Sequence, residues 1–231
     1  AIMAPMKFFR DSIRENKEER KKFKRAPSFV PAGQTTQLIV GASGESDRQI
    51  LLLTQGLYRK ASLKRVYYSA YVPIMKGKNL PAVKAPPFMR ENRLYQADWL
   101  LRFYHFDAEE ILSPEEPDFE DERDPKCCGA RRHIELFPVE VNRAPYEMIL
   151  RVPGIGVRSA LRIMRLRHYG TLNFEDLKNI GVVMKRARYF VTINGKYSAP
   201  GSLDGIDLRN ALISGKAAEE VRQMSLFGGQ A

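Results

Sequence analysis

The sequence predicts an α/β protein in which an incomplete sheet portion is followed by an all-α domain. Residues 37–40 and 65–72 have the composition of strands and flank an amphipathic helix at 46–60, the order of a parallel β-α-β unit with a right-handed crossover. From residue 141 the chain is helical and basic. Residues 107–124 between these regions are strongly acidic, as in a solvated linker. Further strands of the sheet are not evident, which is why we expect it to be incomplete.

These patterns divide the chain into five expected segments. They are a basic N-terminal helix at 1–28, the sheet portion at 29–106, an acidic linker or loop at 107–135, the helical domain at 136–195, and a tail with a short helix at 196–231. A further helix is expected at 91–104 within the sheet portion. The mixed charges of the N-terminal helix fit either a solvated face or a nucleic-acid arm.

The composition is that of a folded protein with a polyanionic partner. The chain has 231 residues, 44% of them hydrophobic, a formal net charge of +11 and a pI near 9.7. Such charge suits nucleic acid or anionic lipid and does not separate them. No apolar run is long enough to span a bilayer or resembles a signal peptide, so we expect a cytoplasmic protein without a membrane partner. The start at Ala1, without an initiator methionine, suggests a piece of a longer protein.

The residue types that usually bind metals are few and scattered. Cys127 and Cys128 are adjacent, and neighbouring cysteines do not ordinarily close an unstrained disulfide or complete a metal shell, so we expect buried or incidental thiols. His105, His133 and His168 are too far apart to form a recognisable triad or ligand set. The acidic stretch matches no calcium loop. The sequence therefore predicts no metal site.

A glycine-containing turn between two helices is the clearest motif. A helix is expected at 142–150, with Asn142 or a near neighbour as its cap and Pro145 in its first turn. It ends at Pro153-Gly154-Ile155-Gly156, where two glycines allow a tight turn and expose backbone amides. The second helix, from residue 157, then presents its N-terminus to solvent. Free amides and the helix dipole favour an anion such as phosphate there.

The second helix carries two separate stripes. Apolar residues at helical spacing should face the core (Val157, Ala160, Leu161 and Met164), and arginines form another stripe (Arg158, Arg162 and Arg165). Three guanidinium groups suit successive phosphates. A more degenerate copy follows at 174–183, with Gly181 in the turn, and leads into further basic residues (Lys185, Arg186 and Arg188). Two such hairpins could bind both strands of a duplex.

Residues 142–167 resemble the helix-hairpin-helix of DNA repair and DNA uptake proteins. The resemblance implies sequence-independent contacts with the DNA backbone, expected to be double-stranded. The DNA-binding residues that it implies are Pro153, Gly154, Ile155, Gly156, Arg158, Arg162, Arg165, Gly181, Lys185, Arg186 and Arg188. A Gly156→Val change should impair both the turn and the approach of phosphate. The alternative is that the hairpin only packs helices or binds protein.

A second resemblance covers residues 29–195. The stretch 34–47, a strand that ends in glycine and is followed by acidic residues, resembles a late strand of the radical S-adenosylmethionine (SAM) barrel. With the segments at 65–71 and 90–102 and the terminal hairpin, the chain is similar to the C-terminal portion of radical SAM proteins of DNA modification or repair. The resemblance implies cofactor contacts at Thr36, Gly41 and Glu45, and implies SAM and a [4Fe-4S] cluster for the full-length family.

The sequence departs from that family at the cluster. The Cys-x-x-x-Cys-x-x-Cys loop that holds it is absent, so no cofactor is expected in this chain alone and its status as an enzyme is open. The catalytic residues are unknown. Glu45, Asp47, Tyr67, Tyr68 and Tyr71 lie near the expected strand ends, but core or loop roles are the simpler explanation for each. Either this is the C-terminal part of an enzyme whose N-terminal barrel region is a partner, or it is a non-catalytic DNA-binding protein or protein-interaction module with the strands as scaffold.

Overall fold

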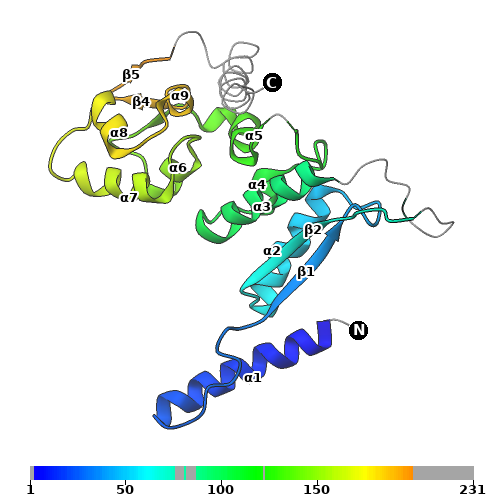
Figure 1. Cartoon of the computed structure of the whole chain (residues 1–231). Helices are drawn as coiled ribbons and strands as arrows, with labels where there is room; N and C mark the ends of the chain where they lie inside the picture. Colours follow the sequence, from blue (N-terminus) through cyan, green and yellow to red (C-terminus); the bar gives the residue numbers. More distant parts are fainter. Residues whose placement is uncertain (1–2, 76–80, 82–86, 122, 200–231) are drawn as a thin grey trace, which may run out of the picture. The chain divides into compact units, whose positions relative to one another are not determined.

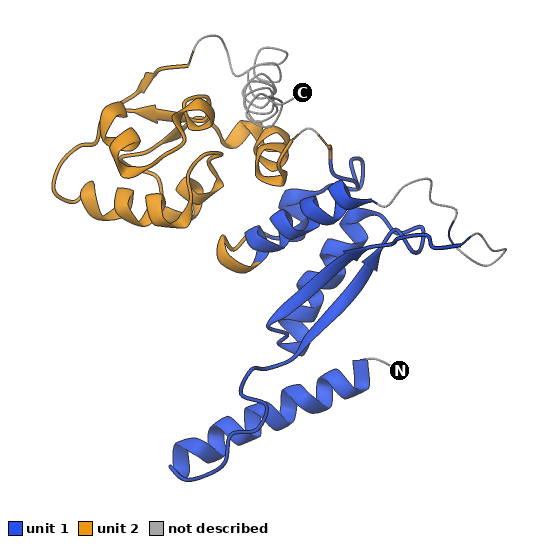
Figure 2. Ribbon diagram, viewed as in Figure 1, with its two compact units in different colours: residues 1–101, 107–119 blue, residues 102–106, 120–231 orange. Residues whose placement is uncertain are grey.

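The computed structural model describes residues 3–75, 81, 87–121 and 123–199. The chain forms two compact units, coloured separately in Figure 2. The first comprises residues 1–101 and 107–119, and the second comprises residues 102–106 and 120–231. The helix expected in the C-terminal tail lies outside the described residues, as does most of the proline-rich stretch at 73–88.

The first unit contains the predicted β-α-β unit. Its elements, labelled in Figure 1, are α1 (Met3–Lys22), β1 (Thr35–Val40), α2 (Asp47–Ala61), β2 (Arg65–Ala70), most of α3 (Phe88–Phe103) and α4 (Ala108–Ile111). The two strands are parallel, with Thr35 opposite Arg65 and Val40 opposite Ala70. The mixed α/β class and the strand-helix-strand order are therefore confirmed. The described part of this unit holds a two-stranded sheet and no closed barrel.

Local signals explain where α2 begins and ends. The Ser46 hydroxyl accepts a hydrogen bond from the Gln49 amide, and the Gln49 side chain returns one to the Ser46 amide, which is a capping box. Ser62 ends the helix in the left-handed conformation. The buried side of α2, which includes Ile50 and Leu57, packs in one core with Val66 and Leu94. This packing holds the two strands against the helices.

Side chains accept hydrogen bonds along the edge of β2 that faces away from β1. The amide of Val66 donates to Tyr58 Oη at 3.1 Å, that of Tyr68 donates to Tyr95 Oη at 3.0 Å, and that of Ala70 donates to the Glu91 carboxylate at 2.8 Å. These amides point away from β1, so another strand would have to displace the three side chains. The sheet therefore ends at β2 because polar side chains satisfy its backbone.

The acidic stretch is divided between the units, which differs from the expected linker. Residues 107–119 belong to the first unit, where the Arg48 amide donates to Pro117 O at 2.8 Å. The Asp47 amide donates to Asp118 Oδ1 at 2.9 Å, and the Phe119 amide donates to Asp47 Oδ2 at 3.0 Å. The acidic segment thus lies against the N-terminal end of α2. There, amides that have no partner within the helix, together with the helix dipole, favour negative charge.

The second unit is not all-α, and that expectation was wrong. It contains α5 (Pro125–Arg132), the 3₁₀ helix η1 (Ile134–Leu136), β3 (Val139–Glu140), α6 (Tyr146–Arg151), α7 (Val157–Leu166), α8 (Phe174–Ile180), α9 (Met184–Ala187), β4 (Val191–Ile193) and β5 (Lys196–Tyr197). The sheet has the order β3-β4-β5, with β3 parallel and β5 antiparallel to β4. Strands of two or three residues are too short to show a periodic pattern.

The buried face of α7 differs in part from the expected one. Ser159, Ala160 and Ile163 are buried, whereas Leu161 is 53% exposed. Ala160 and Ile163 belong to a hydrophobic core to which each helix from α5 to α9 contributes buried side chains. The apolar spacing identified the helix, but two overlapping apolar stripes fitted it and only packing selects between them.

Candidate nucleic-acid interface

The turn between α6 and α7 requires glycine at one position. Gly154 has φ +88°, which side-chain-bearing residues rarely adopt. A Cβ at Gly154 would lie 2.6 Å from the Val183 carbonyl oxygen and 3.1 Å from the Ala187 amide nitrogen. Gly156 instead has φ −95° and ψ 170°, which any residue adopts. The conformational requirement expected of both glycines therefore falls on Gly154.

The segment α8–turn–α9 repeats the pattern of α6–turn–α7. A leucine, a glycine, a β-branched residue and an alanine recur at the same spacing (Leu150, Gly154, Ile155 and Ala160; Leu177, Gly181, Val182 and Ala187). Both glycines have positive φ. The Val183 amide donates to Gly154 O at 2.9 Å, and Ser159 Oγ donates to Gly181 O at 3.2 Å. The two helical hairpins thus pack turn against turn through reciprocal hydrogen bonds.

The N-terminus of α7 has no side-chain cap. Its N-cap is Gly156, and no side chain accepts a hydrogen bond from the first-turn amides. By contrast, Asn173 caps α8 by accepting from two amides, and Asp124 caps α5. An uncapped helix end retains free donors and the positive end of the dipole. The first turn of α7 is therefore open to an external acceptor.

The arginine stripe of α7 lies on the surface. Arg158, Arg162 and Arg165 are exposed, and so is Lys185 in α9. Arg162 donates to Ile180 O at 3.0 Å, which ties α7 to the end of α8. Within the described part of the chain, the side chains of Arg158, Arg165 and Lys185 have no hydrogen-bond or ion-pair partner. Their charges are available to an outside anion.

The other predicted contact residues have internal roles. The Arg186 guanidinium pairs with the Asp124 carboxylate at 3.0 Å, and Arg188 donates to Ser198 O at 3.3 Å. Pro153 and Ile155 are buried and shape the turn from inside. These contacts involve residues far apart in sequence, which is why a count of basic side chains did not separate them from the exposed arginines.

Lys126 lies under the hairpin turn, a position that no sequence pattern predicted. Its Nζ donates to Ile155 O at 2.6 Å and lies 4.8 Å from the centre of the Tyr104 ring. The side chain keeps some exposed surface, but its ammonium group is surrounded by protein, and this desolvation lowers the pKa of Lys126 to about 7, against the opposing effect of Asp124. The lysine therefore links α5 to the turn and titrates near neutrality.

The two cysteines are free, buried thiols, as the sequence analysis expected. Burial raises the pKa of Cys127 well above its ordinary value, and raises the pKa of Cys128 to about 11. Both are protonated at neutral pH, whereas a metal or cluster needs thiolates. Their environment does not suit a [4Fe-4S] cluster.

Of the three residues predicted to contact a cofactor, Gly41 and Glu45 lie together, whereas Thr36 lies apart from them. Both carboxylate oxygens of Glu45 are engaged within its own loop, with the Gly41 amide at 3.1 Å and with the Ser43 hydroxyl. Although burial raises the pKa of Glu45, these hydrogen bonds lower it overall. Thr36 lies near the other end of β1, five residues before Gly41, on the same face as the buried Val40. The Gly41 amide and the Ser43 hydroxyl are thus satisfied by Glu45 and not left for a cofactor.

The acid and tyrosine candidates have structural partners. Asp47 is buried and pairs with Arg90, yet burial dominates and raises the pKa of its carboxyl. Tyr68 is buried, where its hydroxyl lies 3.0 Å from Thr54 Oγ1. The Arg65 guanidinium lies 4.6 Å from the centre of the half-exposed Tyr67 ring, and Tyr71 is partly buried. Packing and pairing account for these side chains.

The described residues contain neither a candidate metal-ligand cluster nor a candidate membrane-spanning helix. In that part of the chain no three His, Cys, Asp or Glu side chains are grouped so that they could hold a metal ion. No helix there is both long and apolar enough to cross a membrane. Comparison of the chain with protein-family models, with curated proteins and with solved structures found no match.

Proposed function

We propose that this protein binds nucleic acid through the first turn of α7 and the basic side chains beside it, without reading base sequence. The observation that carries the proposal is the uncapped N-terminus of α7 next to Arg158, whose charge has no partner in the described chain. Phosphate matches such free amides and the helix dipole, and a guanidinium can bind it with two hydrogen bonds. Arg165 and Lys185 extend the positive surface.

The overall charge supports the same partner. With a net charge of +11, the chain attracts a polyanion at long range, and salt would screen that attraction. Backbone contacts give no sequence information, so we expect similar affinities for unrelated sequences. Duplex DNA and a cytoplasmic location remain the expectation that accompanies this proposal.

The alternative is that the paired hairpins form a protein-interaction module. The reciprocal hydrogen bonds between the turns at Gly154 and Gly181 serve packing equally well without DNA. Lysine is depleted at the centres of protein interfaces but arginine is enriched there, so the side chains on α7 and α9 fit either partner. The affinity measurements below separate the two functions.

A larger assembly is a second proposal, which the uncovered face of the β1–β2 sheet supports. Ile39 is 57% exposed and Tyr67 is 41% exposed on that face, whereas parallel sheets are normally covered on both faces. This is compatible with the C-terminal part of a radical SAM enzyme acting on DNA. The two buried cysteines do not fit the cluster, so another polypeptide region would have to supply its ligands. A Cys-x-x-x-Cys-x-x-Cys loop encoded upstream would support this proposal.

The arginines of α7 provide the direct test of nucleic-acid binding. We expect the Arg158→Ala/Arg165→Ala double variant to bind a DNA duplex about 10- to 100-fold more weakly, because each side chain contributes about 1 kcal/mol or more through phosphate contacts. Fluorescence anisotropy at several salt concentrations measures this. If four phosphates are neutralised, the wild-type slope of log affinity against log salt is about −3.6, and the double variant should lose about half of it.

A matched variant controls for the general loss of charge. Arg143→Ala/Lys196→Ala removes the same two charges from exposed positions outside α7 and α9, and it should weaken binding much less. Equal losses in both double variants would mean that charge alone drives binding. No binding of wild type at low salt would contradict the proposed function and leave the protein-interaction module.

A further inference from the structure

The exposed face of α7 carries apolar side chains among its arginines. Leu161 is 53% exposed and Leu166 is 42% exposed, although both belong to a helix with a well-formed buried side. Tyr169, one turn after Arg165, is 86% exposed. Contacts with phosphate use cations and backbone amides, so they do not account for the leucines and the tyrosine. Their position next to the arginines indicates a ligand with both apolar and anionic parts.

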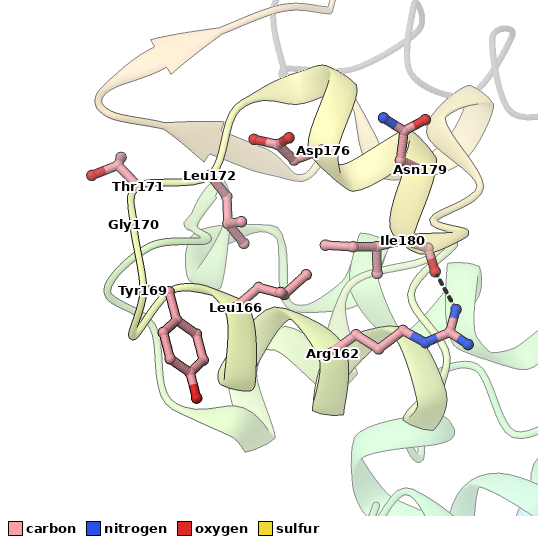
Figure 3. A pocket seen from close by; sticks show the side chains of 9 residues that line it. All are labelled: Arg162, Leu166, Tyr169, Gly170, Thr171, Leu172, Asp176, Asn179 and Ile180. Carbon is pink, nitrogen blue, oxygen red and sulfur yellow. Dashed lines mark hydrogen bonds between the residues drawn. The ribbon is translucent and has the colours of Figure 1, made fainter.

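A groove lies beside Tyr169, between α7 and α8 (Figure 3). It has a volume of about 550 Å³ and an apolar lining from Leu166, Leu172 and Ile180. Asn179 and Asp176 supply polar groups from α8, and one carboxylate oxygen of Asp176 already accepts a hydrogen bond from the Asn173 amide at 2.8 Å. The Arg162 side chain crosses from α7 to α8, where it donates to Ile180 O. A volume of this size is typical of sites for small organic ligands.

A nucleobase has the chemistry that this groove offers. Its flat faces stack on aromatic rings, and its edges form hydrogen bonds with amides and carboxylates. The sugar-phosphate chain that carries the base would then run along the arginines of α7. In an intact duplex the faces of the bases are stacked on one another and are not available to Tyr169. The ligand must therefore contain an unpaired base.

We propose that the α7–α8 groove binds an unpaired nucleobase stacked on Tyr169, next to a backbone held by Arg158 and Arg165. This inference rests on the proposed function and narrows it to nucleic acid with single-stranded character, such as an overhang or a bulge. The chain should bind such a substrate more tightly than an intact duplex of the same length at the same salt concentration.

The test uses the full chain and three DNA probes of equal length. These are an intact duplex, a duplex with one unpaired 2-aminopurine, and a single strand containing 2-aminopurine. We expect quenching of 2-aminopurine fluorescence when wild type binds. Tyr169→Ala should abolish the quenching and weaken binding of the unpaired-base probes about tenfold, with duplex affinity unchanged. Tyr169→Phe retains the ring and should behave as wild type. His168→Ala changes an exposed neighbour that does not line the groove, and it controls for changes in the loop.

The outcomes separate this inference from the proposed function. If wild type binds all probes but 2-aminopurine stays unquenched, or if Tyr169→Ala weakens duplex and unpaired-base binding equally, the inference fails and backbone binding stands. If Arg158→Ala/Arg165→Ala loses affinity for every probe while Tyr169→Ala loses it only for unpaired bases, both are supported. If wild type binds none of the probes, the proposed function fails and the inference fails with it.

Discussion

Replacement of Gly154 by alanine is expected to lower the free energy of unfolding of the second unit by about 4 kcal/mol. Its positive φ costs an L-residue about 1–3 kcal/mol, and the new Cβ would lie 2.6 Å from the Val183 carbonyl oxygen. That oxygen belongs to the backbone of the second hairpin, so relief requires the two turns to separate. The loss should appear as a lower midpoint of urea unfolding followed by circular dichroism.

Alanine substitutions at two other glycines separate the effect of positive φ from the effect of close packing. Gly181 also has positive φ, but its Cβ would meet no atom closer than 3.9 Å, so Gly181→Ala should cost about 1–2 kcal/mol from backbone strain alone. Gly156→Ala should cost less than about 1 kcal/mol, because the backbone is extended and the nearest atom, Tyr104 Oη, is 3.4 Å away. If Gly156→Ala were as harmful as Gly154→Ala, the close packing of the turns would not explain the requirement.

The free energy of unfolding should rise by about 2 kcal/mol between pH 7 and pH 9 because of Lys126. The pKa of this lysine falls from 10.5 in the unfolded chain to about 7 in the folded protein. Between these values the unfolded chain binds more protons than the folded one, so stability increases with pH. The gain is absent below pH 7, where both forms are protonated. Urea unfolding at intervals of half a pH unit measures it.

The two cysteines should end this rise in the free energy of unfolding at about pH 9. Their thiols ionise near pH 9 when unfolded, but the folded pKa of Cys128 is about 11 and that of Cys127 is also raised, so stability should fall as the pH rises beyond about 9. Lys126→Met replaces the ammonium with an apolar group of similar length. It should remove the rise between pH 7 and pH 9 and leave the decline above it. An unchanged rise in Lys126→Met would show that another group is responsible.

The sequence determined the elements whose signals are local. The β-α-β unit was predicted because its strands are rich in β-branched and aromatic residues and its helix is amphipathic. The turn between α6 and α7 was predicted because glycine is needed where φ is positive, as at Gly154. The arginine stripe on α7 followed from helical spacing. Such patterns depend on neighbouring residues, which the sequence lists directly.

Features that depend on residues distant in sequence emerge only when the chain is folded. The sheet of the second unit brings β3 against β4 in strands too short to be recognised. Asp124 binds Arg186 and Lys126 lies under the turn because α5 packs against the hairpins. The side chains of Arg158, Arg165 and Lys185 have no such partner among the described residues. Burial, ion pairing and pKa shifts arise from the whole environment of a side chain. Composition and spacing identified a basic hairpin, and packing determined which of its charges remain free.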